Sequence, residues 1–152
     1  MRAWLLALCL VSSPAWADKA LTLVGTGGEG VELSPQPGQT VLLHFWAIWC
    51  PTCAVDMAAL QEASKGCSPD SVRIVLVNVG DSQSDIERYV ERYGIELPLL
   101  LDPEGDAFRG FGGRGLPMNV EWSKDRLVTD VAPRSEQQWH KRLAALGCAL
   151  SP

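Results

Sequence analysis

Two cysteines spaced as Cys-x-x-Cys follow a long apolar stretch in the first half of the chain. Pro51 and Thr52 separate Cys50 from Cys53, and residues 41–49 before them are almost all apolar or aromatic. A strand that ends here and continues as a helix would place Cys50 at the helix start, where free backbone N–H groups favour a thiolate. Cys53 would lie one turn further on the same helix face, within reach of a disulfide with Cys50. The pattern predicts a redox pair, with Cys50 as nucleophile and Cys53 as resolving thiol.

Two other uses of such a pair are a structural disulfide and half of a zinc site. Zinc bound by four thiolates would need Cys67 and Cys148 to converge on the pair, and those two lack the Cys-x-x-Cys spacing of a second half-site. We therefore expect no metal site. We also expect no organic cofactor, because the cysteine pair itself carries the electrons.

Hydrophobic patterns and turn residues predict the elements that position the pair. We expect strands over 21–24, 31–33, 40–46, 72–79, 97–101, 118–122 and 127–131. We expect a helix from Cys53 towards Gly66, a second one capped by Ser82 or Ser84 and ending at Tyr93, and two more over 107–111 and 135–146. Residues 25–30 match G-x-G-x-x-G, but short strands flank them, so a hairpin loop is favoured over a nucleotide site. This order predicts one α/β domain with a mixed central sheet flanked by helices.

The segment from Trp46 to Cys53 resembles the active-site motif of thioredoxin-fold proteins, specifically of the TlpA/ResA-like group. Further blocks fall in that family's order, namely 21–23, 31–34, 38–43, 93–105 and 112–117. The resemblance covers roughly residues 20–148 and implies a thioredoxin fold with an N-terminal β-hairpin and a central αβ insertion. It also implies a thiol:disulfide oxidoreductase that acts on protein thiols and disulfides and draws on a membrane electron donor.

The resemblance assigns roles to three further residues. A carboxylate three residues after the resolving cysteine exchanges protons with that thiol in the family, and Asp56 matches this place. Asp56 could instead only complement the helix dipole. Gly115-Leu116-Pro117 matches the cis-proline loop, so the Leu116 backbone would offer a short edge to a substrate segment. Apart from the resemblance, Trp46 and Trp49 are most simply a core and a rim aromatic, and Trp49 could also shield the disulfide and touch substrate.

His44 departs from the family, in which Asp or Asn is usual at this strand position. An imidazole here would lie under the active site and could titrate together with the cysteines. The simpler interpretation is a core histidine without a catalytic role.

The N-terminus predicts export. One positive charge at Arg2, a short apolar run and the small-residue pattern Ala15-Trp16-Ala17 predict a signal peptide over 1–17 and a thioredoxin-like domain over 18–152. The run is shorter than the roughly 20 residues that span a bilayer, and a lipoprotein signal at Cys9 would have too short an apolar region. Cleavage would remove one of 13 basic and none of 18 acidic residues, which takes the net charge from -5 to -6. This acidic balance argues against nucleic acid or an anionic membrane as a partner.

Export to a periplasm-like compartment determines how the other cysteines are interpreted, because disulfides persist there. Four cysteines remain after cleavage and allow three pairings. The helix turn sets Cys50 with Cys53, which leaves Cys67 with Cys148 as a structural disulfide.

The predicted function is a periplasmic thiol:disulfide oxidoreductase that acts mainly as a reductant. Pro51-Thr52 is similar to the dipeptide of the cytochrome c maturation reductases. Their acidic loop before the cis-proline is replaced by Arg114-Gly115-Leu116, which favours a more general TlpA-like protein. The alternative is a copper-binding or adaptor module that keeps the fold without the redox activity.

Overall fold

The computed structural model describes residues 19–130 and 134–149. In this part of the chain seven strands form one mixed sheet, in the order β2-β1-β5-β4-β3-β6-β7. The strands are β1 (Leu21–Val24), β2 (Gly30–Leu33), β3 (Thr40–Trp46), β4 (Val72–Val79), β5 (Leu99–Asp102), β6 (Met118–Trp122) and β7 (Leu127–Asp130). The helices are α1 (Pro51–Ala63), α2 (Gln83–Tyr93), α3 (Asp106–Gly110) and α4 (Glu136–Ala145). The predicted signal peptide 1–17 and Val131 of the last predicted strand lie outside the described residues.

Strand β3 lies inside the sheet, with parallel β4 on one side and antiparallel β6 on the other. Strands β4, β3, β6 and β7, with α1 and α4, form the thioredoxin core. The segment α2–β5 extends the sheet beyond β4, and β5 pairs parallel to β4. The antiparallel hairpin β1–β2 completes the sheet through β1, which pairs with β5. The predicted thioredoxin fold is confirmed, with its N-terminal hairpin and central αβ insertion.

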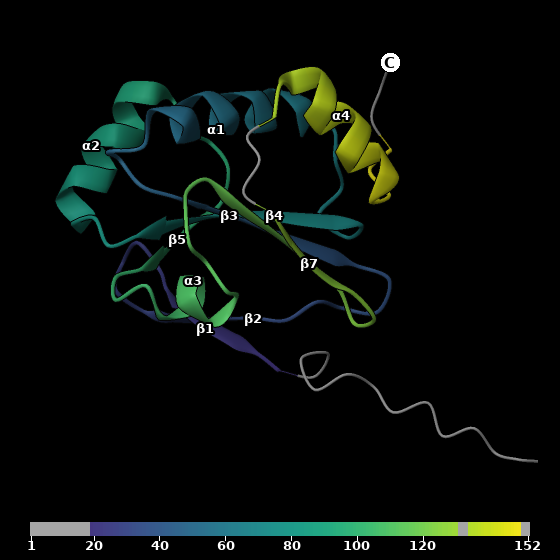
Figure 1. Cartoon of the computed structure of the whole chain (residues 1–152), viewed down its shortest axis with the longest axis horizontal. Helices are drawn as coiled ribbons and strands as arrows, with labels where there is room; N and C mark the ends of the chain where they lie inside the picture. The colour runs from purple at the N-terminus through teal and green to yellow at the C-terminus, as the bar shows by residue number, and fades with distance from the viewer. Residues whose placement is uncertain (1–18, 131–133, 150–152) are drawn as a thin grey trace, which may run out of the picture.

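The sheet separates two apolar cores. Leu42 and Trp46 of β3 pack with α1, α2 and α4, whereas Val41, Leu43 and Phe45 pack on the opposite face with α3 and the hairpin. Figure 1 shows α1, α2 and α4 together on one face of the sheet and α3 on the other. Because side chains alternate along a strand, His44 lies on the same face as Leu42 and Trp46, beneath α1.

Several predicted boundaries differ from the structure by one or two residues, and two of these differences have a clear local cause. Strand β5 starts at Leu99 instead of residue 97, after Pro98, which has no N–H to give to the sheet although its carbonyl accepts a bond from Leu76. Helix α3 starts at Asp106, one residue early, because the Asp102 side chain accepts bonds from the Ala107 and Phe108 N–H groups. Side-chain capping of this kind satisfies the free donors of a helix start.

A disulfide joins Cys67, just after α1, to Cys148, just after α4, with Cα atoms 4.9 Å apart. It lies on the face of the sheet that α1, α2 and α4 cover, where Cys148 is buried in the same core as α1 and α4. Within the described residues, no helix has the length and apolar character needed to cross a membrane.

Candidate functional site

Cys50 lies where β3 ends and α1 begins. It is the N-cap residue of α1, with Pro51 in the first helical turn, and its Sγ accepts a hydrogen bond of 3.2 Å from the Cys53 N–H. Proline suits this place because its missing N–H would be unpaired there in any case. A disulfide joins Cys50 and Cys53, with Cα atoms 5.3 Å apart. The positive end of the helix dipole therefore faces the Cys50 sulfur, which favours a thiolate when the bond is reduced.

The two cysteines are almost equally buried. The exposed fraction of Cys50 is 4%, against 0% for Cys53, so the helix start is not an open position. Trp49, the preceding residue, is 71% exposed, and Trp46 is completely buried in the core. The only polar side chain that contacts the Cys50 sulfur in the described residues is Thr52, whose hydroxyl lies 3.4 Å away. A reaction partner must therefore approach Cys50 closely beside Trp49.

The loop before Cys50 is held by an acidic residue that the sequence analysis did not identify. The Ile48 N–H donates to Asp81 Oδ2 at 2.7 Å, and the Asn78 side-chain amide donates to the same oxygen at 2.8 Å. Asp81 follows the end of β4, next to β3, so the topology brings it to the active-site edge of the sheet. The sequence signal for Asp81 was its position two residues after the end of a predicted buried strand.

Leu116 and Pro117 lie at the same end of the sheet as the cysteines. The peptide bond between them is cis. Phe45 of β3 pairs with Met118 of β6, so Pro117 lies beside the end of β3 that leads to Cys50. Leu116 packs against the core cluster that includes both cysteines. Within residues 19–130 and 134–149, neither the N–H nor the C=O of Leu116 has a hydrogen-bond partner, so both are free to bind another chain.

Asp56 is completely buried one turn after Cys53. Its Oδ1 accepts two hydrogen bonds of 2.7 Å, one from the Arg134 backbone N–H and one from the indole N–H of Trp139. Its Oδ2 has no hydrogen-bond partner among the described residues. A group placed only to complement the helix dipole would face solvent, so this burial favours a chemical role over the dipole interpretation.

His44 lies directly below Asp56 and is also completely buried. Its Nδ1 is 2.8 Å from the Asn119 side-chain oxygen and 3.7 Å from Asp56 Oδ2. Burial lowers the pKa of His44 from its ordinary value of 6.5, and the neighbouring Asp56 carboxylate opposes this change. The histidine is thus a core residue, as the simpler interpretation held, but one with two polar neighbours that the sequence did not reveal.

Side chains from β6, β7 and the start of α4 extend this buried polar group. The Asn119 amide donates to Asp130 at 3.5 Å, and the Arg134 guanidinium pairs with Asp130 at 2.6 Å. The same guanidinium lies 4.7 Å from the ring centre of Trp139. These residues face His44 and Asp56 only because antiparallel pairing places His44 opposite Asn119 and Asn119 opposite Asp130. Sequence reasoning could not find them without that register.

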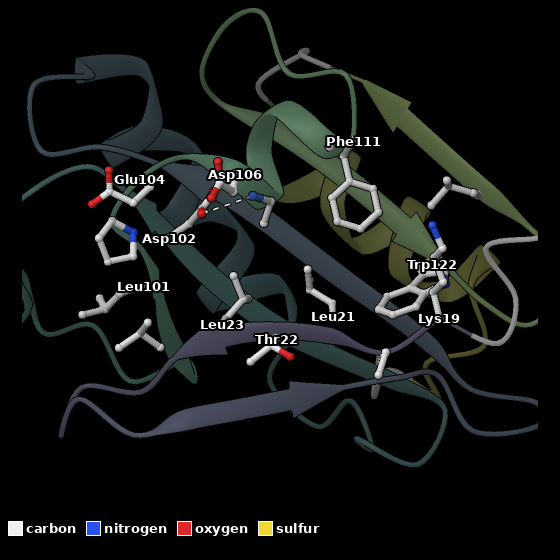
Figure 2. Close-up of a pocket in the computed structure, with 16 residues that line it drawn as sticks. Lys19, Leu21, Thr22, Leu23, Leu101, Asp102, Glu104, Asp106, Phe111 and Trp122 are labelled. Carbon is white, nitrogen blue, oxygen red and sulfur yellow. Dashed lines mark hydrogen bonds between the residues drawn. The ribbon is translucent and has the colours of Figure 1, made fainter.

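A separate cavity of about 580 Å³ lies between β1, the β5–α3 turn and Trp122. Figure 2 shows Leu21, Leu23, Phe111 and Trp122 around it, with Asp102 already bonded to α3. None of the cysteines and none of their polar neighbours line it, so it is not part of the cysteine site. Among the described residues, no group of three or more His, Cys, Asp and Glu side chains is arranged to hold a metal ion.

Comparison with known proteins gives a consistent set of matches. The AhpC/TSA family profile matches residues 16–129. The thiol-disulfide oxidoreductase ResA of Bacillus subtilis is 30% identical over 117 residues, which cover 74% of this chain and 65% of ResA. Sporulation thiol-disulfide oxidoreductase A of the same organism is 31% identical over 116 residues, covering 72% of this chain and 70% of that protein.

A solved structure agrees with these matches. The exposed lipoprotein thioredoxin Etrx1 of Streptococcus pneumoniae superposes with a TM-score of 0.68 at 26% identity, over 84% of this chain and 99% of that one. The chain spans 53% and 65% of the length of two ResA relatives.

Proposed function

The chain belongs to the AhpC/TSA family and is a relative of the ResA-type thiol-disulfide oxidoreductases, and from this premise we propose that it exchanges thiols and disulfides through Cys50 and Cys53. The observation that carries the proposal is the Cys50–Cys53 disulfide at the start of α1. The electrons are stored in this bond, so the reaction needs no organic cofactor.

In the reductive direction Cys50 attacks first. Its thiolate bonds to one sulfur of a substrate disulfide, and the other substrate sulfur leaves as a thiolate. Cys53 then loses its proton and attacks Cys50, which closes the Cys50–Cys53 disulfide and releases the second substrate thiol. Two electrons pass from the enzyme dithiol to the substrate disulfide. The oxidative direction is the same path in reverse.

Asp56 is the proton acceptor for Cys53 in this scheme. It lies one turn after Cys53 on α1, where residues three apart share a helix face, and both are completely buried. A buried thiol needs a nearby base because its thiolate is poorly solvated there. Asp56→Asn should therefore slow release of the mixed disulfide more than its formation. Equal effects on both steps would leave Asp56 with a structural role.

The client polypeptide would bind beside Cys50 along the free backbone edge of Leu116. An extended segment can pair with that N–H and C=O as an added strand, next to Pro117. Trp49 and Val55 are both 71% exposed on either side of the cysteines and offer apolar contacts to the same client. Exposed aromatic side chains are frequent anchors of protein interfaces.

We place the protein in the periplasm, as a reductant supplied by a membrane electron donor. Two observations support this: the signal-like N-terminal sequence, and the relative in S. pneumoniae that is an exposed lipoprotein. Strong oxidants owe their potential to a heavily stabilised Cys thiolate. Among the described residues, the groups that hydrogen-bond to the Cys50 sulfur are the Cys53 N–H and the Thr52 hydroxyl, and neither of them is charged.

The decisive test is a trap with Cys53→Ser in cells. This variant should hold Cys50 in its mixed disulfide with natural partners, which non-reducing electrophoresis and mass spectrometry would identify. Cys50→Ser is the matched control and should capture none. The proposal predicts a membrane electron donor and an oxidised client among the partners. A wild-type pair that stays oxidised in cells, or a reduced protein that binds copper but reduces no disulfide, would contradict it.

A further inference from the structure

Two buried polar atoms in the active-site core, on side chains that approach each other to 3.7 Å through a different nitrogen, have no hydrogen-bond partner in the described part of the chain. They belong to Asp56, through Oδ2, and to His44, through Nε2. Both side chains are completely buried. A buried polar group without a partner typically costs about 1–3 kcal/mol, so two in adjacent residues call for an explanation. The steps proposed above use Asp56 and leave His44 without a role.

The hydrogen bonds fix the tautomer of His44. The Asn119 amide nitrogen donates to Asp130, so the Asn119 oxygen is the atom that faces His44 Nδ1, at 2.8 Å. An amide oxygen only accepts, and His44 Nδ1 must therefore carry the proton. In the neutral imidazole the free lone pair is then on Nε2, which has no partner. His44 Nε2 can therefore accept one proton.

The charged side chains around His44 bind other partners and do not occupy Nε2. Asp130 and Arg134 pair with each other, and the Oδ1 of Asp56 is occupied by two N–H donors. Among the described residues, the titratable and charged groups around His44 are thus Asp56 from α1, Asp130 from β7 and Arg134 before α4. Burial lowers the pKa of His44, so the ring is neutral near pH 7 and its Nε2 lone pair is unprotonated. Nδ1 lies 3.7 Å from Asp56 Oδ2, so a charge on either side chain acts directly on the other.

We propose that His44 is a positioning residue that shares with Asp56 the proton taken from Cys53, so that the buried acid–base group of this enzyme is the His44–Asp56 pair. The inference rests on the proposed oxidoreductase function and deepens it. In the resolving step the S–H bond of Cys53 breaks and the pair gains that proton. The Cys53 thiolate then bonds to Cys50 Sγ, and the Cys50–substrate bond breaks with its electron pair on the substrate sulfur. The pair returns its proton to Cys53 when the disulfide is next reduced.

The first test needs no catalysis and uses the wild-type protein. Nitrogen-15 NMR of the imidazole rings reads the tautomer directly, and the chain contains one other histidine, His140, whose signals disappear in His140→Asn. In the oxidised protein, His44 should carry its proton on Nδ1. Reduction of Cys50–Cys53 should shift the pH at which the His44 ring titrates by about one pH unit, as expected for strongly coupled sites. Asp56→Asn should abolish that redox-linked shift.

The second test separates the two chemical steps. Reduced protein, with Cys67–Cys148 left oxidised, is mixed with the chromogenic disulfide 5,5′-dithiobis(2-nitrobenzoate). Attack by Cys50 releases the first coloured thiolate, and resolution by Cys53 releases the second. His44→Asn should leave the first phase unchanged and slow the second about tenfold near neutral pH, a part of the roughly 100-fold or more that general acid–base catalysis supplies. It should also change the pH profile of the second phase. His140→Asn, a half-buried site on α4, is the matched control and should match wild type.

The double variant His44→Asn, Asp56→Asn completes the test. If the two residues act as one unit, the double variant should be about as slow as Asp56→Asn alone. The inference is overturned if the rate losses of the two single variants multiply in the double variant, or if His44→Asn keeps the wild-type pH profile of the second phase. It is also overturned if the titration of the His44 NMR signals does not change with the redox state of Cys50–Cys53. If the oxidoreductase function itself is wrong, the wild-type protein gives no second phase with the chromogenic disulfide. The NMR titration would still show whether the His44 ring responds to the redox state of Cys50–Cys53.

Discussion

Cys50 and Cys53 differ most in their position on α1. Cys50 is the N-cap, and its sulfur accepts a hydrogen bond from the Cys53 N–H, whereas Cys53 lies inside the helix. In the reduced protein, Cys50 should therefore react with iodoacetamide at lower pH than Cys53 does. Alkylation rates against pH, measured on Cys53→Ser and Cys50→Ser, check this. Both rates should be slow relative to a free thiol, because both residues are buried. Reaction of Cys53 at the lower pH would reverse the assignment of nucleophile.

His44 should make the stability of the protein depend on pH. Burial lowers its pKa in the folded state below the ordinary 6.5, so the unfolded chain binds this proton at higher pH than the native state does. The free energy of unfolding contributed by His44 is then fully present above 6.5 and is lost as pH falls towards the lowered folded pKa. The slope for one proton is at most about 1.4 kcal/mol per pH unit.

Urea unfolding of the oxidised protein between about pH 7.5 and about pH 5.5 measures this dependence. His44→Asn should show a flatter profile than wild type over this range. An unchanged slope in His44→Asn would mean that His44 is protonated equally in the folded and unfolded states.

At the scale of elements, α4 is tied to β6 by a charged pair. Arg142 donates through Nε and Nη2 to both carboxylate oxygens of Glu121, whose side chain is only 4% exposed. Arg142→Met would leave that carboxylate buried without its partner. We expect a loss of about 3 kcal/mol, at the low end for buried pairs because the Arg142 side chain is 28% exposed. Urea unfolding checks this, with the exposed Lys141→Met as control. A loss no larger than the control's would show that solvent replaces the arginine.

Most elements were predictable because their signals are local. The bounds of β3, β4 and β6 follow from apolar runs, and Gly94 ends α2 in the left-handed conformation that glycine adopts easily. The Cys-x-x-Cys motif likewise predicted the Cys50–Cys53 disulfide that the structure contains. The contacts of His44 and the role of Asp81 were not predictable, because they depend on which strands are neighbours and on their register. No local pattern encodes that pairing.

At the scale of the whole molecule, the Cys67–Cys148 disulfide closes a loop with a sequence separation of 81 residues. In the chain-entropy account a loop of this length contributes about 4 kcal/mol, by restricting the unfolded chain. The variant Cys67→Ser, Cys148→Ser should be less stable by up to that amount in non-reducing urea unfolding. Its Cys50 reactivity should be unchanged, because the two disulfides share no residue. An equal unfolding midpoint would show that the bond does not constrain the unfolded chain.

The indole of Trp139 gives this fold a spectroscopic consequence. Its N–H bonds to Asp56, and its ring carries the Arg134 guanidinium on one face. The emission of an indole responds to charges placed against it, so a proton gained or lost at Asp56 changes the fluorescence of a residue 83 positions away along the chain. Trp139 thus places an intrinsic fluorophore in direct contact with the buried polar group beneath the cysteines.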